Sequence, residues 1–320
     1  MKIKNIITKR NIIDEHCYHL VKEWEDALVE AWGVRLVDDN NHRNGRIYTI
    51  SPKLANVLTP HCNSFVFDMN EKEYKGHNKK NIIPYIIDFF TKKDDLDLFF
   101  KHYSNHKIVI VSSKEVYDFL LEHNCPFKIA HCALSISDEY KINENTEFEK
   151  TYDFVLAGRP NKVLQIYLDE YIKKHNCNNY IIRKKEGKEF VYYHSDGTRL
   201  GVLNRKDYVK MLRQSKILFY STPGIDGGET RTNGFNQVTP RFLEAIASGC
   251  HILARYPKNS DTGWYGIESI CKNIEDYQQF ETEMDFALSH KVDMKKYSDF
   301  LANHYTSIRI KQLEEIIKEF

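Results

Sequence analysis

The sequence lacks an excess of charge of either sign, because 46 Lys and Arg residues nearly balance 45 Asp and Glu residues. No overall field therefore draws the chain to nucleic acid or to an anionic membrane, and any site for an anion must be local. The seven cysteines are scattered and never form a Cys-x-x-Cys pair. This distribution favours a reducing compartment over a disulfide framework and predicts no metal site.

Long apolar runs are also missing. No stretch of 18 apolar residues occurs, and the basic N-terminus contains no apolar run of the length that a signal peptide needs. We therefore expect a cytoplasmic chain that could still contact the inner face of a membrane. His16 and His19 flank Cys17, but without a further liganding motif they do not indicate a metal.

The length of 320 residues predicts two domains, because one hydrophobic core rarely serves a chain of this size. Short apolar runs alternate with amphipathic stretches in both halves, the pattern of βα units around a parallel sheet. The polar segment 138–150 is interpreted as the linker, with an ordinary solvated loop as the alternative. We predict an α/β fold of two Rossmann-like domains facing a cleft: residues 1–145, 146–275, and helices over 276–320 that brace the two.

Individual elements follow from the same periodicity. Ser112 and Glu115 form a capping-box pattern that predicts a helix up to about Glu122, and Ser51-Pro52 predicts another helix start. An apolar stripe of Ile308, Leu313 and Ile316/Ile317 indicates a C-terminal helix. The predicted strands are 65–68, 82–87, 107–111, 153–157, 180–183, 217–220 and 250–254, and further helices are predicted over 206–214 and 242–248.

The segment 237–249 is the strongest candidate for a ligand-binding site in the sequence. Thr239 suits a helix N-cap and Pro240 suits the first helical position, so unpaired amides and the positive end of a dipole should be available to a phosphate. Arg241 and Glu244 share one helix face, which matches a phosphate followed by a sugar ring with vicinal hydroxyls. The alternative for this pair is a weak surface contact between residues i and i+3.

Two other segments support a site for an anion. The long loop Ser221 to Val238 contains four glycines, and loops of this length are usually functional. After a predicted strand, Gly158, Arg159 and Lys162 emerge at the carboxyl edge of the sheet, where open α/β sheets bind ligands. Two cations there could neutralise a diphosphate, although a turn of this kind taken alone is usually just exposed to solvent.

These motifs resemble the GT-B glycosyltransferases, in particular their family 1/4-like C-terminal donor domain. The resemblance covers residues 150–275 and rests on Ala157-Gly158-Arg159, on Tyr208 to Tyr220, and on Arg241 to Gly249. It implies that Glu244 holds the ribose of a nucleotide, that Arg159 and Lys162 meet its diphosphate, and that no metal is needed. The expected donor-binding residues are Gly158, Arg159, Lys162, Asn236, Gln237, Val238, Thr239, Arg241 and Glu244.

One position departs from the family pattern. Many retaining members have a glutamate eight residues before the ribose glutamate, and here that position is Asn236. A retaining mechanism is therefore not implied. The first half matches no motif of the family, so its role on the acceptor side is implied by the architecture alone.

The predicted function is transfer of a sugar from a nucleotide-diphosphate sugar to a hydroxyl of a saccharide or lipid-linked acceptor, in surface polysaccharide or glycoconjugate synthesis. A general base is expected from Asp68, Asp88 or His131, and a satisfied polar residue or cap is the alternative for each. A nucleotide-sugar epimerase of the same fold and a non-catalytic nucleotide-binding or scaffold module remain open. The run Arg183 to Lys185 is interpreted as a solvated face, or more weakly as a dock for anionic lipid.

Overall fold

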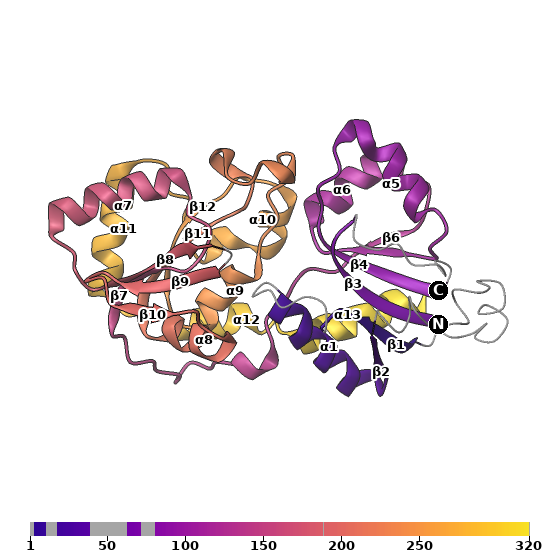
Figure 1. The fold of residues 1–320 in the computed structure, drawn as a ribbon, viewed down its shortest axis with the longest axis horizontal. Coiled ribbons are helices and arrows are strands. Elements are labelled where there is room, and N and C mark those ends of the chain that lie inside the picture. The colour runs from indigo at the N-terminus through magenta and orange to yellow at the C-terminus, as the bar shows by residue number, and fades with distance from the viewer. Residues whose placement is uncertain (1–2, 11–17, 39–62, 72–80, 188, 320) are drawn as a thin grey trace. The chain divides into compact units, whose positions relative to one another are not determined.

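The computed structural model describes residues 3–10, 18–38, 63–71, 81–187 and 189–319 (Figure 1). The chain divides into two compact units. Unit 1 consists of Met1–Asp138, Arg231–Phe235 and Tyr305–Phe320. Unit 2 consists of Glu139–Thr230 and Asn236–His304.

Unit 1 is built on a parallel sheet whose strand order is β2-β1-β3-β4-β5-β6. Near-continuous apolar runs such as Ile82–Asp88 form its inner strands, because both faces of a parallel sheet are covered by helices. The strands are β1 (Ile3–Thr8), β2 (Arg35–Asp38), β3 (Asn63–Asn70), β4 (Ile82–Asp88), β5 (Val109–Val111) and β6 (Ile129–His131), and the helices are α1 (His19–Trp32), α5 (Leu96–Tyr103), α6 (Lys114–Glu122) and α13 (Thr306–Lys318).

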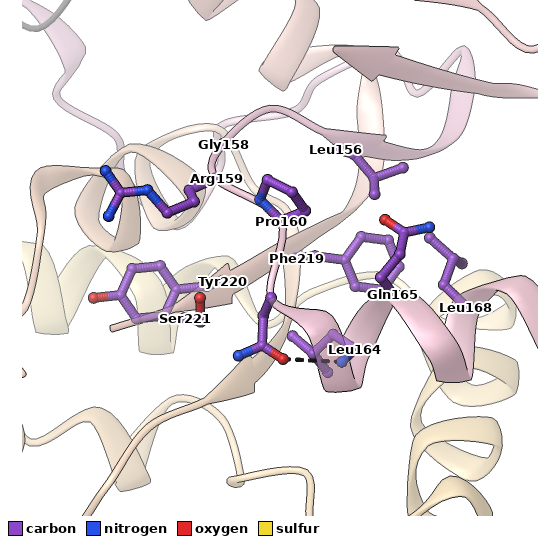
Figure 2. Close-up of a pocket in the computed structure, with 11 residues that line it drawn as sticks. Leu156, Gly158, Arg159, Pro160, Leu164, Gln165, Leu168, Phe219, Tyr220 and Ser221 are labelled. Atoms are coloured by element: carbon purple, nitrogen blue, oxygen red, sulfur yellow. Dashed lines mark hydrogen bonds between the residues drawn. The ribbon is translucent and has the colours of Figure 1, made fainter. Parts of the chain in front are cut away.

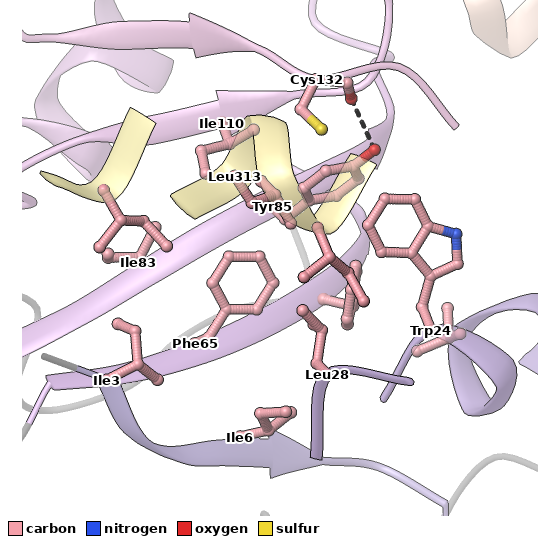
Figure 3. Close-up of a cluster of buried hydrophobic side chains, with 14 of the residues drawn as sticks. Ile3, Ile6, Trp24, Leu28, Phe65, Ile83, Tyr85, Ile110, Cys132 and Leu313 are labelled. Carbon is pink, nitrogen blue, oxygen red and sulfur yellow. Dashed lines mark hydrogen bonds between the residues drawn. The ribbon is translucent and has the colours of Figure 1, made fainter. Parts of the chain in front are cut away.

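Alternate residues of these strands fill two separate cores. On one face, α1 and α13 cover Phe65 and Tyr85, with Trp24 and Leu313 fully enclosed (Figure 3). The Tyr85 hydroxyl donates to the backbone carbonyl of Cys132 at 2.6 Å, so its polar end is satisfied in the core. Helices α5 and α6 cover the other face (Figure 1). They pack against Ile86 of β4 and Val109 and Val111 of β5, which alternate with the residues of the first core.

The segment Arg231–Phe235 packs into this second core of unit 1. The Phe235 ring lies 5.6 Å from Phe89 and 5.1 Å from Phe119, measured between centroids. The Asn233 side-chain amide donates to the carbonyl of Phe90 at 2.5 Å. The long loop predicted as one functional segment is therefore shared between the units, and only its remaining parts belong to unit 2.

Unit 2 has a six-stranded sheet with the order β10-β9-β8-β7-β11-β12. Its strands β8, β7, β11 and β12 run parallel, whereas β9 and β10 add an antiparallel edge that the sequence analysis did not anticipate. The strands are β7 (Tyr152–Leu156), β8 (Tyr180–Glu186), β9 (Glu189–His194), β10 (Arg199–Gly201), β11 (Ser215–Ser221) and β12 (His251–Arg255).

Helices cover both faces of this second sheet (Figure 1). One core joins α7 and α11 to the sheet through Phe154, Ile217 and Phe280. Phe242 of α9 is fully buried. The helices are α7 (Lys162–His175), α8 (Arg205–Arg213), α9 (Pro240–Ala247), α10 (Ser260–Tyr265), α11 (Tyr277–Ser289) and α12 (Met294–Leu301), and short 3-10 helices occupy Lys93–Asp95, Asp138–Tyr140, Ile225–Gly227, Thr230–Thr232 and Ile267–Ser269.

The predicted α/β class and the predicted strands are confirmed, with ends that differ by a few residues. The capping box at Ser112 is wrong. Ser113 caps α6 by accepting from the amide of Val116, while the Ser112 hydroxyl donates to the carbonyl of Ile87. The helix start at Ser51-Pro52 lies outside the described residues.

The domain limits also differ from those expected. The chain passes between the units at Asp138 and Glu139, at the start of the predicted linker rather than near residue 145. Helices α11 and α12 belong to unit 2, and α13 belongs to unit 1. Among the helices of the described residues, none has the length and apolar character needed to cross a bilayer.

Replacing Leu313 by Ala should lower the free energy of unfolding by about 3 kcal/mol, because it leaves a cavity in a fully enclosed part of the unit 1 core. The matched control is Leu98→Ala in α5 of the same unit, since Leu98 is 70% exposed. Urea unfolding followed by tryptophan fluorescence compares the two variants. Equal losses of stability would contradict the placement of α13.

Candidate functional site

The candidate site lies at the carboxyl end of β7 in unit 2, where Gly158 follows the strand. A Cβ atom built on Gly158 would lie 1.9 Å from the Nη1 atom of Arg241. The guanidinium of Arg241 therefore lies against the backbone of Gly158, and a side chain at position 158 would displace it. The absence of a side chain at Gly158 thus makes room for the Arg241 guanidinium.

Arg241 is partly buried and lies near polar side chains of unit 2. Burial lowers the pKa of its guanidinium, but the nearby Tyr208 and Glu244 raise that pKa on balance, so Arg241 stays charged. The Nε atom of Arg241 is buried and has no hydrogen-bond partner among the described residues. A charged donor left in this state points to a missing acceptor, because buried polar groups are almost always paired.

Arg183 of β8 brings a second guanidinium to the same place. Its group lies over the Phe190 ring at 4.1 Å from the centroid. Burial lowers the pKa of Arg183, and the positive charge of Arg241 lowers it further. Lys184 and Lys185 are exposed, but Arg183 is half-buried, so the interpretation of this run as a solvated face is wrong for its first residue.

Glu244 of α9 is held by two residues of α8. The Arg205 guanidinium forms an ion pair with its Oε1 atom, and the Tyr208 hydroxyl donates to its Oε2 atom at 3.3 Å. The Glu244 side chain is only 12% exposed. A weak surface pair between Arg241 and Glu244, the alternative left open above, is therefore wrong.

The basic residues after β7 lie at the rim of the site. The Arg159 guanidinium pairs with Glu229 at 2.8 Å and is half exposed, and Lys162 is exposed at the start of α7. Asn161 caps α7 by accepting from the amides of Val163 and Leu164. The loop is therefore well defined, and it leaves the cation of Lys162 accessible.

A pocket beside this loop is too small for a nucleotide. It lies between the start of α7 and the end of β11, with Pro160 and Tyr220 on its wall (Figure 2). Its volume is about 20 Å³, enough for about one water molecule. A nucleotide would have to lie over the strand ends, outside this pocket.

The start of α9 differs from the expectation of free amides. The amide of Val238 donates to Asp261, the amide of Thr239 donates to the Tyr220 hydroxyl, and Pro240 has no N–H. Thr239 occupies the N-cap position as predicted, but its side chain forms no cap. The helix start therefore offers fewer amides to a phosphate than its sequence suggested.

Side chains at this helix start provide unsatisfied polar atoms instead. The Nε2 atom of Gln237 and the Oγ1 atom of Thr239 are buried without a hydrogen-bond partner among the described residues. Asn236 differs, because its Oδ1 atom accepts from the Thr222 hydroxyl at 2.8 Å. Gln237, Thr239 and Arg241 thus present three buried atoms that a ligand could satisfy.

The charges around Gly158 do not balance. Five cations, Arg159, Lys162, Arg183, Arg205 and Arg241, lie in this part of unit 2 beside three carboxylates of the described residues, Glu229, Glu244 and Asp261. Like charges held close in a partly buried site raise the free energy unless an anion joins them. The arrangement is therefore suited to a ligand that carries at least two negative charges.

The three candidate bases lie in unit 1. Asp68 of β3 is fully buried and accepts from the Lys9 ammonium at 2.9 Å. Asp88 ends β4 and is half-buried. His131 ends β6, and its Nε2 atom donates to the carbonyl of Ser112 at 3.2 Å. Burial lowers the pKa of His131 to about 4, which keeps the ring neutral at neutral pH.

Comparisons with known proteins identify the architecture. No family model and no curated protein matches the chain. A structure titled "Trehalose-6-phosphate from E. coli bound with UDP-2-fluoro glucose" matches with a TM-score of 0.58 and 9% identity over 99% of each chain. An alpha,alpha-trehalose-phosphate synthase (UDP-forming) from Burkholderia vietnamiensis also gives 0.58, with 10% identity over 100% of this chain and 99% of the other. The chain has the GT-B fold.

A GtfA/B complex matches with a TM-score of 0.50 and 12% identity, over 84% of this chain. The match covers only 60% of the length of the GtfA/B chain. The two-domain Rossmann-like architecture predicted from the sequence is thus confirmed.

Among the described residues, no group of three or more His, Cys, Asp or Glu side chains is arranged to hold a metal ion.

Sequence reasoning missed Arg183 and Arg205. Tyr208 was part of the motif that carried the resemblance, but it had no assigned role. A helical spacing of three residues places Arg205 and Tyr208 on one face of α8, and this signal was available. That this face meets Glu244 depends on the packing of α8 against α9, which a local pattern does not show.

Replacing Gly158 by Ala should displace the Arg241 guanidinium, because the added methyl group would lie 1.9 Å from its Nη1 atom. Since that atom is the far end of a flexible side chain, the free energy of unfolding should fall by about 1 kcal/mol or less. The control is Gly263→Ala in α10, where no atom lies within 4 Å of the added methyl group. That variant should be as stable as the wild type or slightly more stable. Thermal and urea unfolding measure the stability of both variants. The Nε–Hε NMR resonance of Arg241 should move in Gly158→Ala and stay in place in Gly263→Ala, and a resonance that does not move in Gly158→Ala would contradict the position of Arg241.

The low pKa of His131 predicts a loss of stability in acid. Its pKa is about 4 in the folded chain against an ordinary value of 6.5, so the unfolded chain binds the proton more readily. Stability from this group is complete above pH 6.5 and falls as the pH drops towards 4, by about 3 kcal/mol in all. A His131→Asn variant should lose correspondingly less stability between pH 7 and 4 in urea titrations, and identical losses would refute the shift.

Proposed function

We propose that the chain is a glycosyltransferase that moves a sugar from a nucleotide-diphosphate sugar to an acceptor hydroxyl, with the donor held by unit 2. The observation that carries this proposal is the excess of guanidinium charge around Gly158, together with the unpartnered Nε atom of Arg241. A diphosphate supplies both the charge and the acceptor oxygens that these groups lack.

The fold supports the same conclusion. The carboxyl ends of parallel strands are where open α/β sheets bind ligands, and Gly158 follows the inner strand β7 of unit 2. Glycosyltransferases recur among the solved structures of this fold, and one of them is titled as bound with UDP-2-fluoro glucose. These likenesses favour a nucleotide sugar over other diphosphates as the ligand.

The proposed reaction requires above all that the negative charge of the leaving diphosphate be stabilised. The bond between the anomeric carbon and the diphosphate oxygen breaks, and a bond from the acceptor oxygen to that carbon forms. Arg241 and Arg183 stabilise the charge that develops on the departing diphosphate, and Arg159 and Lys162 add to the field from the rim. Preorganised charges of this kind commonly make the largest contribution to catalysis. Glu244 accepts from the ribose hydroxyls.

The acceptor must lose a proton, and unit 1 is proposed to supply the base. Among the three candidates, Asp68 is least suited because the Lys9 ammonium pairs with it inside the unit. His131 is neutral at neutral pH and can take a proton, although its low pKa makes it a weak base. Asp88 and His131 are therefore the stronger candidates.

Several finer features belong to the proposal. We propose a metal-independent hexosyltransferase, since guanidinium groups can neutralise the diphosphate, and a saccharide or lipid-linked saccharide as acceptor. The setting would be surface polysaccharide or glycoconjugate synthesis in the cytoplasm, at the inner face of the membrane when the acceptor is lipid-linked. The neighbouring structures of this fold guide these choices by analogy.

The test begins with calorimetric titration of UDP, GDP and ADP into the chain. At least one should bind, and Arg183→Met should weaken that binding about tenfold or more because it removes a charge-assisted contact. The matched control is Lys185→Met on the same strand, whose side chain is exposed and whose affinity should stay within about twofold of wild type. Glu244→Ala should also weaken binding.

Turnover completes the test. The corresponding nucleotide sugar is incubated with saccharide acceptors in the presence of EDTA, and the released nucleoside diphosphate and the glycosylated product are measured. Transfer that continues in EDTA is expected. Failure of all three nucleotides to bind would overturn the proposal, and conversion of the donor to an isomeric sugar without acceptor would replace transfer by epimerisation.

A further inference from the structure

We propose that Arg205 is a positioning residue that holds the Glu244 carboxylate in place for the ribose, and that it thereby makes the site select ribonucleotides over 2′-deoxyribonucleotides. This inference rests on the proposed function, because it assigns the ribose to Glu244. It adds a residue to which neither the sequence motifs nor the leaving-group chemistry gives a role.

Two side chains of one helix hold the two oxygens of this carboxylate. The Arg205 guanidinium pairs with Oε1 of Glu244, and the Tyr208 hydroxyl donates to Oε2 at 3.3 Å. Arg205 is the first residue of α8, and Asn204 caps that helix by accepting from the amide of Asp207 at 2.9 Å. The start of α8 is thus well defined, and so is the origin of the Arg205 side chain.

Arg205 is itself held in place. Its guanidinium lies over the ring of Tyr140 at 5.2 Å from the centroid and over the ring of Tyr208 at 5.9 Å. Its side chain is only 18% exposed. A planar guanidinium stacked on aromatic rings and paired to a carboxylate has few other positions available. The geometry therefore constrains Glu244 through Arg205.

The carboxylate keeps capacity for a ligand. A carboxylate has about four acceptor positions, and the contacts with Arg205 and Tyr208 use one on each oxygen. The second position on each oxygen can accept from the two neighbouring hydroxyls of a ribose. Because the carboxylate does not need to be ordered when the nucleotide arrives, both hydrogen bonds contribute more fully to affinity.

This arrangement predicts a specific loss for deoxynucleotides. A 2′-deoxyribose lacks one of the two hydroxyls, so the fixed carboxylate loses one charged hydrogen bond and cannot turn to recover it. The expected preference of the wild-type chain for a ribonucleotide over its 2′-deoxy counterpart is about tenfold or more. If Arg205 is removed, the carboxylate becomes mobile, and the preference should fall to about threefold or less.

The experiment measures dissociation constants by calorimetry for UDP, GDP and ADP, each beside its 2′-deoxy counterpart. Wild type is compared with Arg205→Met, Arg205→Lys, Glu244→Gln and the double variant Arg205→Met with Glu244→Gln. The ratio of the two constants is the readout, because losses of affinity from changed charge or packing affect both nucleotides and cancel. Thermal unfolding confirms that each variant is folded, and Arg205→Lys should restore part of the ratio.

The outcomes separate this inference from the function on which it rests. If no nucleotide binds to wild type, the proposed function fails. If nucleotides bind and Arg205→Met leaves the ratio unchanged or increases it, the positioning role is overturned, and Arg205 competes with the ribose for Glu244. In the Glu244→Gln background the ratio should be low already, and Arg205→Met should change it no further.

Discussion

The contact between Arg241 and Gly158 is the constraint on which the candidate site depends. The guanidinium lies where a Cβ atom of residue 158 would be. The start of α9 therefore contacts the end of β7 through the Arg241 side chain and the Gly158 backbone. This contact places a permanent charge at the carboxyl edge of the unit 2 sheet. It also buries the Nε atom of Arg241 without a partner among the described residues, so the folded chain retains a hydrogen-bonding demand that a ligand can meet.

Further cations increase the affinity of this site for an anion. Arg183 comes from β8 and Arg205 from α8, and with Arg159, Lys162 and Arg241 they outnumber the carboxylates Glu229, Glu244 and Asp261 among the described residues. A net positive site that is partly removed from water attracts polyanions strongly, because its charges are less screened than those at the surface. The site is therefore expected to cost folding stability and to return that free energy when an anion binds. The Glu244 carboxylate adds hydrogen-bond acceptors for hydroxyl groups to the same site.

Much of this could be predicted from the sequence, and the limits have physical causes. Buried strands such as β4 and β11 have apolar runs with clear ends, and the segment 240–249 joins a helix start to a close-packed face, so both kinds of element were predicted correctly. The role of Arg183 was missed because its two exposed lysine neighbours suggest a solvated strand. The amides before α9 were misjudged, since their partners Asp261 and Tyr220 come from other parts of unit 2. Tertiary contacts of this kind leave no local pattern.

The most direct measurement of the central claim is the NMR resonance of the Arg241 side-chain Nε–Hε group during titration with UDP. The resonance is assigned by its loss in an Arg241→Lys variant, and calorimetry on the same sample establishes saturation. A diphosphate bound at Gly158 should shift this resonance in proportion to occupancy, as the Nε–H group acquires an acceptor. A resonance that stays unchanged while the nucleotide saturates the chain would place the diphosphate elsewhere and contradict the account.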